Sequence, residues 1–360
     1  IRDRNWLEGS FPGFDKVNAR AMRERLVVAS RACRGCPVGC GKISEVKEGP
    51  YAGCRVEGPE YETLFALGPL CYNDDLDSIA KLNELCDRLG LDTISTGNVL
   101  AFAMECYERG LVEAEEAGGL DLRFGNHEAM VVAVERIALR EGDFFRLLGE
   151  GVAKASKQVK GSEEFAIHVK GLEPPGYDPR GLKGVALAYA VSARGACHLR
   201  HTVYRPNLTG HHPFRPGARV DRFSYEGQAE VVVELEDFYA VVDSMVLCRF
   251  LCLPTIGPVL WEELAAIYSA ITGVELKPEG LRGVGRVIND LVRAFNVREG
   301  VSRKDDILPR RFFEHPVAGQ VVEKEGFEKM LSEYYALRGW DEEGKPRFLP
   351  PLPGLSERKL

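Results

Sequence analysis

Hydrophobic residues along this chain recur mainly at helical spacing, three or four positions apart. The clearest stretch has an apolar face made up of Ile79, Leu82, Cys86 and Leu89. Asp74 or Asp75 stands where a helix N-cap is expected, and Gly90 stands where a glycine commonly ends a helix. The pattern therefore predicts a well-delimited helix between these residues.

The same spacing predicts helices along most of the remaining chain. One is expected to begin at Ser95 or Thr96 and to end near Gly110. The others are expected at about 17–29, 127–141, 143–158, 183–194, 225–248, 259–272, 279–296 and 325–337. Residues 41–60 have the composition of irregular or short-strand sequence, and few segments alternate with a period of two. We expect a mostly α fold.

The segment 172–181 interrupts this helical pattern with three prolines and two glycines. A chain of 360 residues is also longer than the roughly 250–300 residues at which a single hydrophobic core stops growing. We therefore predict two helical domains, at 1–167 and 168–360, with the boundary just before this segment.

Charge and composition exclude some classes of partner. The net charge of −7 argues against nucleic acid or an acidic membrane surface, because both repel a net anion. No run of sequence approaches the roughly twenty apolar residues of a membrane span. Ten scattered cysteines, in a chain large enough to fold without disulfides, are typical of a reducing compartment. We expect a cytoplasmic protein with no membrane span.

Three of the cysteines lie within eight residues, at Cys33, Cys36 and Cys40. Gly35 and Gly39 would let the backbone curl around a metal centre, because glycine accepts positive φ at little steric cost. Their amides could also donate hydrogen bonds to sulfur. A zinc site usually needs a second pair of ligands, which is missing here. The spacing favours a [4Fe–4S] cluster over zinc or unligated thiols, with a fourth thiolate from elsewhere.

The remaining cysteines are all candidates for the fourth ligand: Cys54, Cys71, Cys86, Cys106, Cys197, Cys248 and Cys252. Cys86 and Cys106 fall on apolar helix faces, where free cysteine behaves as a small hydrophobic residue. Cys248 lies at the end of a long predicted helix, but spacing alone does not favour it over Cys197 or Cys252.

Other polar residues have both a structural and a functional interpretation. Asp87 and Asp92, in the pattern Asp-x-x-Gly-Leu-Asp, are most simply part of a helix end. They could also accept hydrogen bonds from the edge of a nitrogen-rich ring. Glu62 and His198 are a carboxylate and an imidazole, a common acid–base combination, although each alone is typical of a surface or core position.

Together these stretches resemble the aldehyde ferredoxin oxidoreductase family of tungstopterin enzymes, over nearly the whole chain. Seven motifs in family order carry the resemblance: the three-cysteine loop and residues 60–63, 73–97, 177–181, 194–198, 243–248 and 295–309. It implies the two helical C-terminal domains of that fold. It also implies a further partner, the family's N-terminal β-rich domain, which forms a base for the cofactor and is absent from this sequence.

The resemblance implies a role for each matching residue. The ligands of the [4Fe–4S] cluster would be Cys33, Cys36, Cys40 and Cys248. Contacts to one pterin of a tungsten (or molybdenum) bis-pterin cofactor, of the tungstopterin/molybdopterin type, would come from Asp87, Leu91 and Asp92. Contacts to the other pterin would come from Asp243, Leu247 and Cys248. Arg200 matches a basic position near the pterin, and Glu62 and His198 would face the metal and handle protons.

The activity that the resemblance implies is oxidation of an aldehyde and water to a carboxylic acid. Two electrons would pass one at a time through the cluster to ferredoxin. One residue departs from the family pattern, because Val246 stands where the second pterin motif usually has glycine.

Two other functions fit the same residues. One is a family relative that reduces an aromatic acyl thioester within a larger electron-transfer complex. The other is a cluster-bearing electron-transfer subunit without an active site of its own. Members of the family often pair, so a homodimer is a further expected partner beside ferredoxin.

Overall fold

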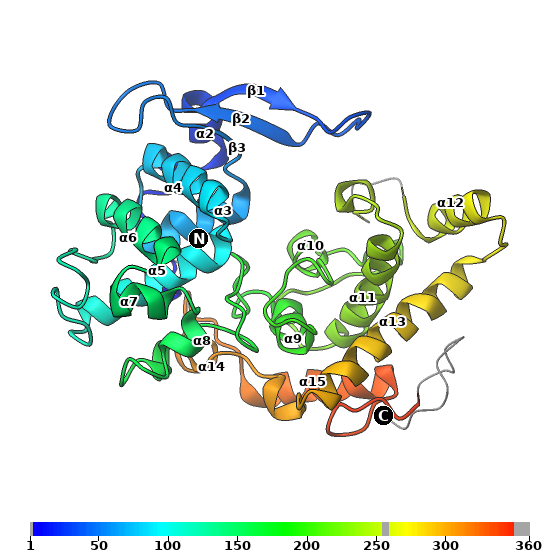
Figure 1. Ribbon diagram of the computed structural model, residues 1–360. Helices are drawn as coiled ribbons and strands as arrows, with labels where there is room; N and C mark the ends of the chain where they lie inside the picture. The colour runs from blue at the N-terminus through cyan, green and yellow to red at the C-terminus, as the bar shows by residue number, and fades with distance from the viewer. Residues whose placement is uncertain (1–2, 254–258, 349–360) are drawn as a thin grey trace. The chain divides into compact units, whose positions relative to one another are not determined.

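The structure, a computed structural model, describes residues 3–253 and 259–348, and its contacts divide them between two units. The first unit contains residues 3–176 together with a later segment of the chain, Pro309–Gln320. The second unit contains the other described residues, within 177–308 and 321–348 (Figure 1).

Short strands and helices open the first unit and give way to longer helices. Its elements are α1 (Phe14–Val17), α2 (Ala19–Arg25), β1 (Val27–Arg31), β2 (Gly41–Glu45), β3 (Arg55–Glu57), α3 (Tyr61–Leu67), η1 (Pro69–Cys71), α4 (Leu76–Leu89), α5 (Thr93–Glu108), α6 (His127–Leu139), α7 (Gly142–Leu148), α8 (Val152–Ala155), η2 (Glu163–Phe165) and, from the returning segment, α14 (Arg310–Glu314). The strands form one antiparallel sheet in the order β1-β2-β3, with Arg31 opposite Gly41 and Glu45 opposite Arg55.

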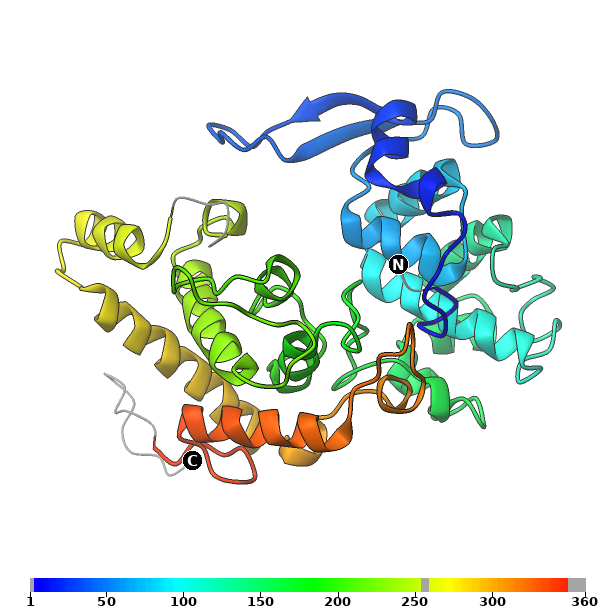
Figure 2. The ribbon, with the colours of Figure 1, turned by 180° about the vertical axis from the view of Figure 1, so that it is seen from behind.

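The described part of the second unit is built from helices and short 3-10 turns. They are α9 (Lys183–Val191), α10 (Tyr204–Thr209), α11 (Gln228–Ser244), η3 (Arg249–Leu251), α12 (Trp261–Thr272), α13 (Pro278–Arg298), η4 (Arg303–Asp305) and α15 (Lys324–Arg338). Helices α11 and α13 lie side by side in both views (Figures 1 and 2).

Helix α5 is the centre of the first unit, since every residue from Thr96 to Cys106 is buried. It packs against α3 with little space between the two backbones. A Cβ atom on Gly97 would lie 2.3 Å from the carbonyl oxygen of Ala66, so only glycine fits at this crossing. The close packing holds α3, which carries Glu62, against the core.

Arg311 of α14 anchors the returning segment to the first unit. Its guanidinium donates to both carboxylate oxygens of Glu105 in α5, at 2.9 and 2.6 Å, and both side chains are buried. Two parallel hydrogen bonds between arginine and a carboxylate fix orientation as well as distance. This pair explains why Pro309–Gln320 belongs to the first unit although the sequence on both sides belongs to the second.

Helix α11 organises the second unit by contacting α9, α13 and α15. Gly285 of α13 lies directly against it, because a Cβ there would meet the Asp237 carbonyl oxygen at 2.2 Å. Arg338 of α15 pairs with Glu236 and Asp237 of α11 at 2.7 and 2.5 Å. These contacts fix α11, whose C-terminal end leads into residues 243–248.

The expected mostly α fold is confirmed, and so is the helix predicted from the clearest apolar face. That helix is α4, which begins after Asp75. The Asp75 carboxylate accepts a hydrogen bond from the amide of Ser78 at 2.6 Å. Gly90 ends the helix in the left-handed conformation, with φ of 72°.

Three element predictions were wrong in part. The helix expected over 17–29 ends at Arg25, because the β-branched pair Val27 and Val28 enters strand β1, which pairs with β2. The helix expected over 143–158 is divided into α7 and α8, with Gly149 and Gly151 between them.

The third error concerns the start of α5. Ser95 and Thr96 were the expected caps, but the helix begins at Thr93. Asp92 is the N-cap, and its carboxylate accepts a hydrogen bond from the amide of Ser95 at 2.8 Å.

The division into domains at 1–167 and 168–360 stays a prediction, since contacts alone define the two units, which change at residues 176 and 177. Within residues 3–253 and 259–348, no helix combines the length and the apolar character needed to cross a membrane.

Candidate metal and cofactor site

The three-cysteine loop connects β1 to β2 at the end of an antiparallel hairpin. Gly35 and Gly39 adopt φ of 74° and 55°, the left-handed region that glycine enters without steric cost. Gly41 begins β2, where an added Cβ would meet the Arg31 carbonyl oxygen at 3.0 Å and the Glu57 carboxylate at 2.8 Å. Glycine is therefore needed both for the curl of the loop and for closure of the hairpin.

A backbone amide already donates a hydrogen bond to one sulfur atom of this loop. The amide of Val38 donates to the Sγ atom of Cys36 at 3.4 Å, and the amide of Cys36 donates to the Cys33 carbonyl oxygen at 3.0 Å. Hydrogen bonds from amides to thiolates are one means by which proteins stabilise iron–sulfur clusters. The loop therefore has the donors and the backbone freedom that a thiolate-bound cluster requires.

Exposure separates the ten cysteines into two groups. Six are buried: Cys54, Cys71, Cys86, Cys106, Cys197 and Cys252. The four that are exposed or half-buried are Cys33, Cys36, Cys40 and Cys248. Burial raises the pKa of the Cys54 and Cys252 thiols to about 11, and those of Cys86 and Cys106 to about 12. These buried groups remain thiols at neutral pH, whereas a metal ligand must be a thiolate.

Across the described residues, no group of three or more His, Cys, Asp or Glu side chains is arranged to hold a metal ion. Cys33, Cys36 and Cys40 belong to the first unit and Cys248 to the second, so their joint ligation stays a prediction. The residues nonetheless fit a cluster, because the three loop thiols are accessible and one of them already accepts an amide hydrogen bond.

The first predicted pterin turn follows α4. Its backbone closes with a hydrogen bond from the amide of Leu91 to the carbonyl oxygen of Cys86 at 2.9 Å, across Gly90. The exposed Asp87 carboxylate accepts from the Asn83 amide group at 2.8 Å. Asp92 then caps α5. The helix-end interpretation of this motif is therefore correct, and the pterin contact stays a prediction beside it.

The second predicted turn follows α11 and has the same backbone. The amide of Leu247 donates to the carbonyl oxygen of Val242 at 3.1 Å, and Cys248 is the N-cap residue of the next short helix, η3. Val246 occupies the place of Gly90, with φ of 56° and 90% of its surface exposed. The departure from glycine thus leaves the turn unchanged, at the cost of placing a β-branched residue in the left-handed region.

Asp243 is held differently from Asp87. Both of its carboxylate oxygens accept hydrogen bonds from Arg249 at 2.8 Å, and Arg200 approaches to 3.6 Å. Arg249 also donates to the Leu199 carbonyl oxygen and lies over the ring of Tyr239. Sequence reasoning did not single out Arg249. The available signal was a cation immediately after Cys248 and six residues after an aspartate.

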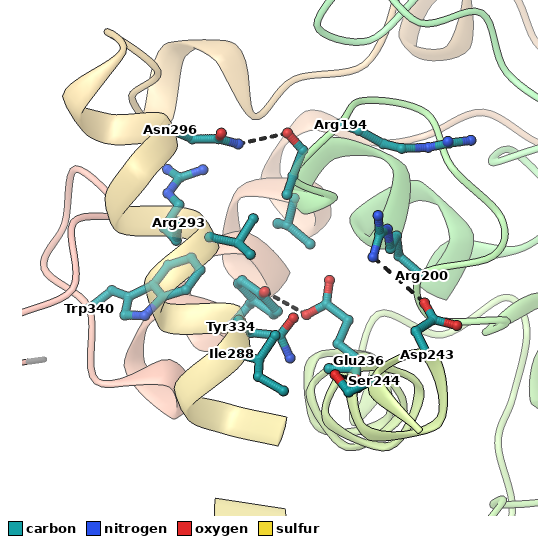
Figure 3. Close-up of a pocket in the computed structure, with 15 residues that line it drawn as sticks. Arg194, Arg200, Glu236, Asp243, Ser244, Ile288, Arg293, Asn296, Tyr334 and Trp340 are labelled. Atoms are coloured by element: carbon teal, nitrogen blue, oxygen red, sulfur yellow. Dashed lines mark hydrogen bonds and ion pairs between the residues drawn. The ribbon is translucent and has the colours of Figure 1, made fainter. Parts of the chain in front are cut away.

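Arg200 and Asp243 line one pocket of about 430 Å³ within the second unit. Figure 3 shows Arg200 reaching toward Asp243, with Glu236 and Tyr334 lying deeper and joined by a hydrogen bond. Helices α11 and α13 form its walls. Two of the residues assigned to the cofactor by resemblance therefore line the same concave surface, whereas Leu247 is not part of its lining.

Glu62 is half-buried on α3 and is held by the segment that ends the first unit. Its Oε2 atom accepts a hydrogen bond from the amide of Gly176 at 2.6 Å. The neighbouring Tyr61 hydroxyl donates to the carbonyl oxygen of the same glycine at 3.2 Å. A Cβ on Gly176 would lie 2.8 Å from the Phe65 ring, so this peptide packs closely on α3. The Glu62 carboxylate consequently has a fixed direction.

His198 is half-buried in the second unit beside an aromatic pair. Its ring centroid lies 5.9 Å from that of Tyr177 and 6.3 Å from that of Tyr204, and the two tyrosines stack at 3.9 Å. Burial, together with the smaller effect of the positive charges of Arg249 and Arg194, lowers the pKa of His198 to about 4. The imidazole is therefore neutral at physiological pH. It can donate one hydrogen bond and accept another.

Comparison with known proteins covers nearly all of this chain. The family described as "Aldehyde ferredoxin oxidoreductase, domains 2 & 3" matches residues 1–348.

The chain belongs to the aldehyde ferredoxin oxidoreductase family.

Curated relatives agree with this membership. The chain is 36% identical over 350 residues to a tungsten-containing aldehyde ferredoxin oxidoreductase of Pyrococcus furiosus, covering 95% of this chain and 55% of that protein. It is 35% identical over 366 residues to the Thermococcus kodakarensis protein of the same name, covering 98% and 57%. The aliphatic sulfonate oxidoreductase, WOR-like subunit, of Pyrococcus furiosus is 31% identical, with 96% and 53% covered. The chain thus spans a little more than half the length of these family members.

A solved structure has the same fold. It is described as the active site complex BamBC of benzoyl coenzyme A reductase in complex with 1,5-dienoyl-CoA. Its superposition has a TM-score of 0.74, with 20% sequence identity, and covers 91% of this chain and 52% of that one. At this identity the likeness concerns the fold of the family alone.

Proposed function

We propose that this chain is the helical part of a tungsten (or molybdenum) pterin oxidoreductase that oxidises aldehydes to carboxylic acids. Electrons leave through a [4Fe–4S] cluster to ferredoxin, in the cytoplasm. The observation that carries the proposal is the sorting of the cysteines by exposure. The four accessible thiols are the same four that the family pattern assigns to the cluster, and the other six are buried.

The ligand set is Cys33, Cys36, Cys40 and Cys248. The accessible position of these sulfurs supports it, because thiolates must reach iron and each must lose its proton. Buried Cys252, four residues from Cys248, is a poor ligand by the same criterion, since burial raises its pKa to about 11.

The two turns after α4 and α11 are proposed to hold the two pterins. In each turn a left-handed residue follows the helix, and the next backbone amide closes the turn. Asp87, Leu91 and Asp92 serve one pterin, and Asp243 and Leu247 serve the other. Arg200 supplies positive charge beside the second, where its ion pair with Asp243 at 3.6 Å orients both groups.

The reaction is R-CHO + H2O → R-COO⁻ with release of three protons and two electrons. The metal and its pterins supply the two-electron oxidation when bound. This chain's residues supply position and proton transfer. Glu62, held in one direction by the Gly176 amide, acts as the base toward water or the hydrated aldehyde. His198, neutral at physiological pH, either polarises the substrate oxygen with a hydrogen bond or takes up a proton.

Replacing Glu62 with Gln in the whole protein, purified without oxygen, tests this role. Glutamine keeps an oxygen that accepts from the Gly176 amide but does not take up a proton. We expect aldehyde-dependent reduction of ferredoxin to fall at least about a hundredfold, within the range for general-base catalysis, while cluster absorbance is unchanged. Glu60→Gln, at the exposed N-cap of the same helix, is the matched control. Full activity in Glu62→Gln would remove this residue from the role.

Two alternatives are separated by metal analysis and by choice of substrate. Relatives of similar identity carry names for different activities, including the aliphatic sulfonate oxidoreductase subunit, so the scaffold serves more than one substrate. Reduction of an aromatic acyl thioester within a larger complex is the alternative reaction. Iron without tungsten, molybdenum or pterin would instead favour an electron-transfer subunit that has no active site.

A further inference from the structure

Lys42, the second residue of β2, turns its side chain back onto the three-cysteine loop. Its ammonium nitrogen lies 3.3 Å from the Gly39 carbonyl oxygen, 3.1 Å from that of Cys40 and 3.1 Å from that of Gly41. A lysine ammonium has three N–H donors and no acceptor. Three carbonyl oxygens of consecutive residues therefore use the whole hydrogen-bonding capacity of this one group.

These contacts fix the backbone on both sides of Cys40. The Gly39 carbonyl belongs to the peptide unit before Cys40, and the Cys40 carbonyl belongs to the unit after it. Because each peptide unit is planar, holding its carbonyl oxygen fixes the whole unit, including the amide on the opposite side. The direction in which Cys40 projects its thiol thus depends on Lys42.

The charge of Lys42 is not neutralised by a carboxylate. Among the described residues Lys42 forms no ion pair, and its partners are the three neutral carbonyl groups. The acidic side chain beside Gly41, Glu57, pairs instead with Arg31 at 2.7 Å. One positive charge therefore remains at the base of the cysteine loop.

We propose that Lys42 is a positioning residue for the iron–sulfur cluster. It fixes the Cys40 backbone, and its charge raises the reduction potential of the cluster. The inference rests on the proposed function, since it requires that Cys33, Cys36 and Cys40 bind iron.

The sign of the effect follows from the charge of the cluster. A cubane with four thiolate ligands is anionic, and reduction adds one more negative charge. A fixed cation nearby stabilises the reduced form more than the oxidised form. Removing the cation therefore lowers the reduction potential of the cluster. A different cationic side chain of similar length keeps the potential unchanged.

The test uses the whole protein, purified without oxygen, with three variants. Lys42→Met removes the charge and the donors while keeping the length of the side chain, and Lys42→Arg keeps the charge and the donors. Lys47→Met is the matched control, because Lys47 is exposed two residues beyond the end of β2. Iron and acid-labile sulfide are counted, and the cluster is titrated under redox control with its electron paramagnetic resonance signal as the readout.

We expect Lys42→Met to lower the ratio of reduced to oxidised cluster about tenfold at a fixed potential, which corresponds to 59 mV for one electron. We expect Lys42→Arg and Lys47→Met to stay close to the unmodified protein. If Lys42→Met instead loses iron while Lys42→Arg keeps it, the positioning role is supported by rescue.

Three results would count against the inference. An unchanged potential and iron content in Lys42→Met would overturn it, and so would an equal shift in Lys47→Met, which would indicate a general effect of net charge. Loss of iron in both Lys42 variants would exclude rescue by a similar cation and overturn it as well. Absence of iron from the unmodified protein would instead remove the proposed function itself.

Discussion

The turns at residues 87–92 and 243–248 have one backbone and two electrostatic environments. Each ends a long helix, places its fourth residue at positive φ and closes with a hydrogen bond from the fifth residue's amide. In each, the sixth residue, Asp92 or Cys248, is the N-cap of the next helix. In the first turn Asp87 accepts a hydrogen bond from the amide group of Asn83, whereas in the second turn Asp243 pairs with two arginines, Arg249 and Arg200.

The two turns show that the backbone conformation and the chemical group at the sixth position are determined by different residues. A helix end needs a left-handed residue and a capping residue, and both turns supply them, even where Val246 replaces glycine. The sixth residue is free to be a carboxylate or a thiol, because either can follow the turn in extended conformation. The same turn therefore joins two helices in the first unit, whereas in the second unit it also presents a candidate metal ligand.

The largest expected difference between the turns concerns their sixth residues. Cys248→Ser should lose most of the iron from the whole protein, because serine does not replace a cluster thiolate. Asp92→Ser should keep its iron, since serine caps helices about as well as aspartate. Iron analysis and visible absorbance of protein purified without oxygen measure both variants.

The serine substitutions separate ligation from capping, since serine can occupy an N-cap position in either turn. Cys252→Ser is the control for general sensitivity of this region, because Cys252 is fully buried. Equal iron in Cys248→Ser and the unmodified protein would remove Cys248 from the ligand set.

An intermediate effect is expected from exchanging the left-handed residues. Gly90→Val should lower the free energy of local opening around α4 by about 1–2 kcal/mol, the cost of a side chain in the left-handed region. Val246→Gly should raise the free energy of local opening around residues 243–248 by a smaller amount, about 0.5 kcal/mol. The gain is small because glycine has more conformational freedom to lose on folding. Hydrogen exchange of peptides covering each turn measures both.

Val246→Ala is the matched control for the second exchange, since alanine retains the Cβ atom that causes the strain. Because Val246 is 90% exposed, its removal sacrifices little packing. Equal protection in Val246→Gly and Val246→Ala would indicate that backbone strain at this residue is negligible.

The smallest expected effect concerns the aspartates that begin the two motifs. Asp243→Asn removes the charge that Arg249 and Arg200 share, and should destabilise residues 243–249 by about 1 kcal/mol, or about fivefold faster exchange. Asp87→Asn should change exchange around its own turn very little, because its partner is the neutral Asn83. Similar changes in both variants would contradict the electrostatic difference between the turns.

Local signals in the sequence predicted part of this structure correctly. Helix α4 was expected from its apolar face, with Asp75 at its start and Gly90 at its end, since these interactions lie within four residues. The start of α5 was misplaced because two residue types that cap well, at Asp92 and Ser95, lie three positions apart. Strand β1 was mistaken for helix because its extended structure depends on pairing with β2, in which Val27 lies opposite Ser44 and Ala29 opposite Ile43.

By itself the sequence determined the helices whose caps are local, the three-cysteine loop and the resemblance that identifies the family. Only the tertiary structure decided which of ten thiols remain accessible, that Val246 keeps the backbone of a glycine, and that Pro309–Gln320 returns to the first unit through Arg311 and Glu105. The physical reason is the distance along the sequence over which each interaction acts. Caps and apolar periodicity act within one or two helical turns, whereas burial and ion pairing depend on residues that the chain brings together from far apart.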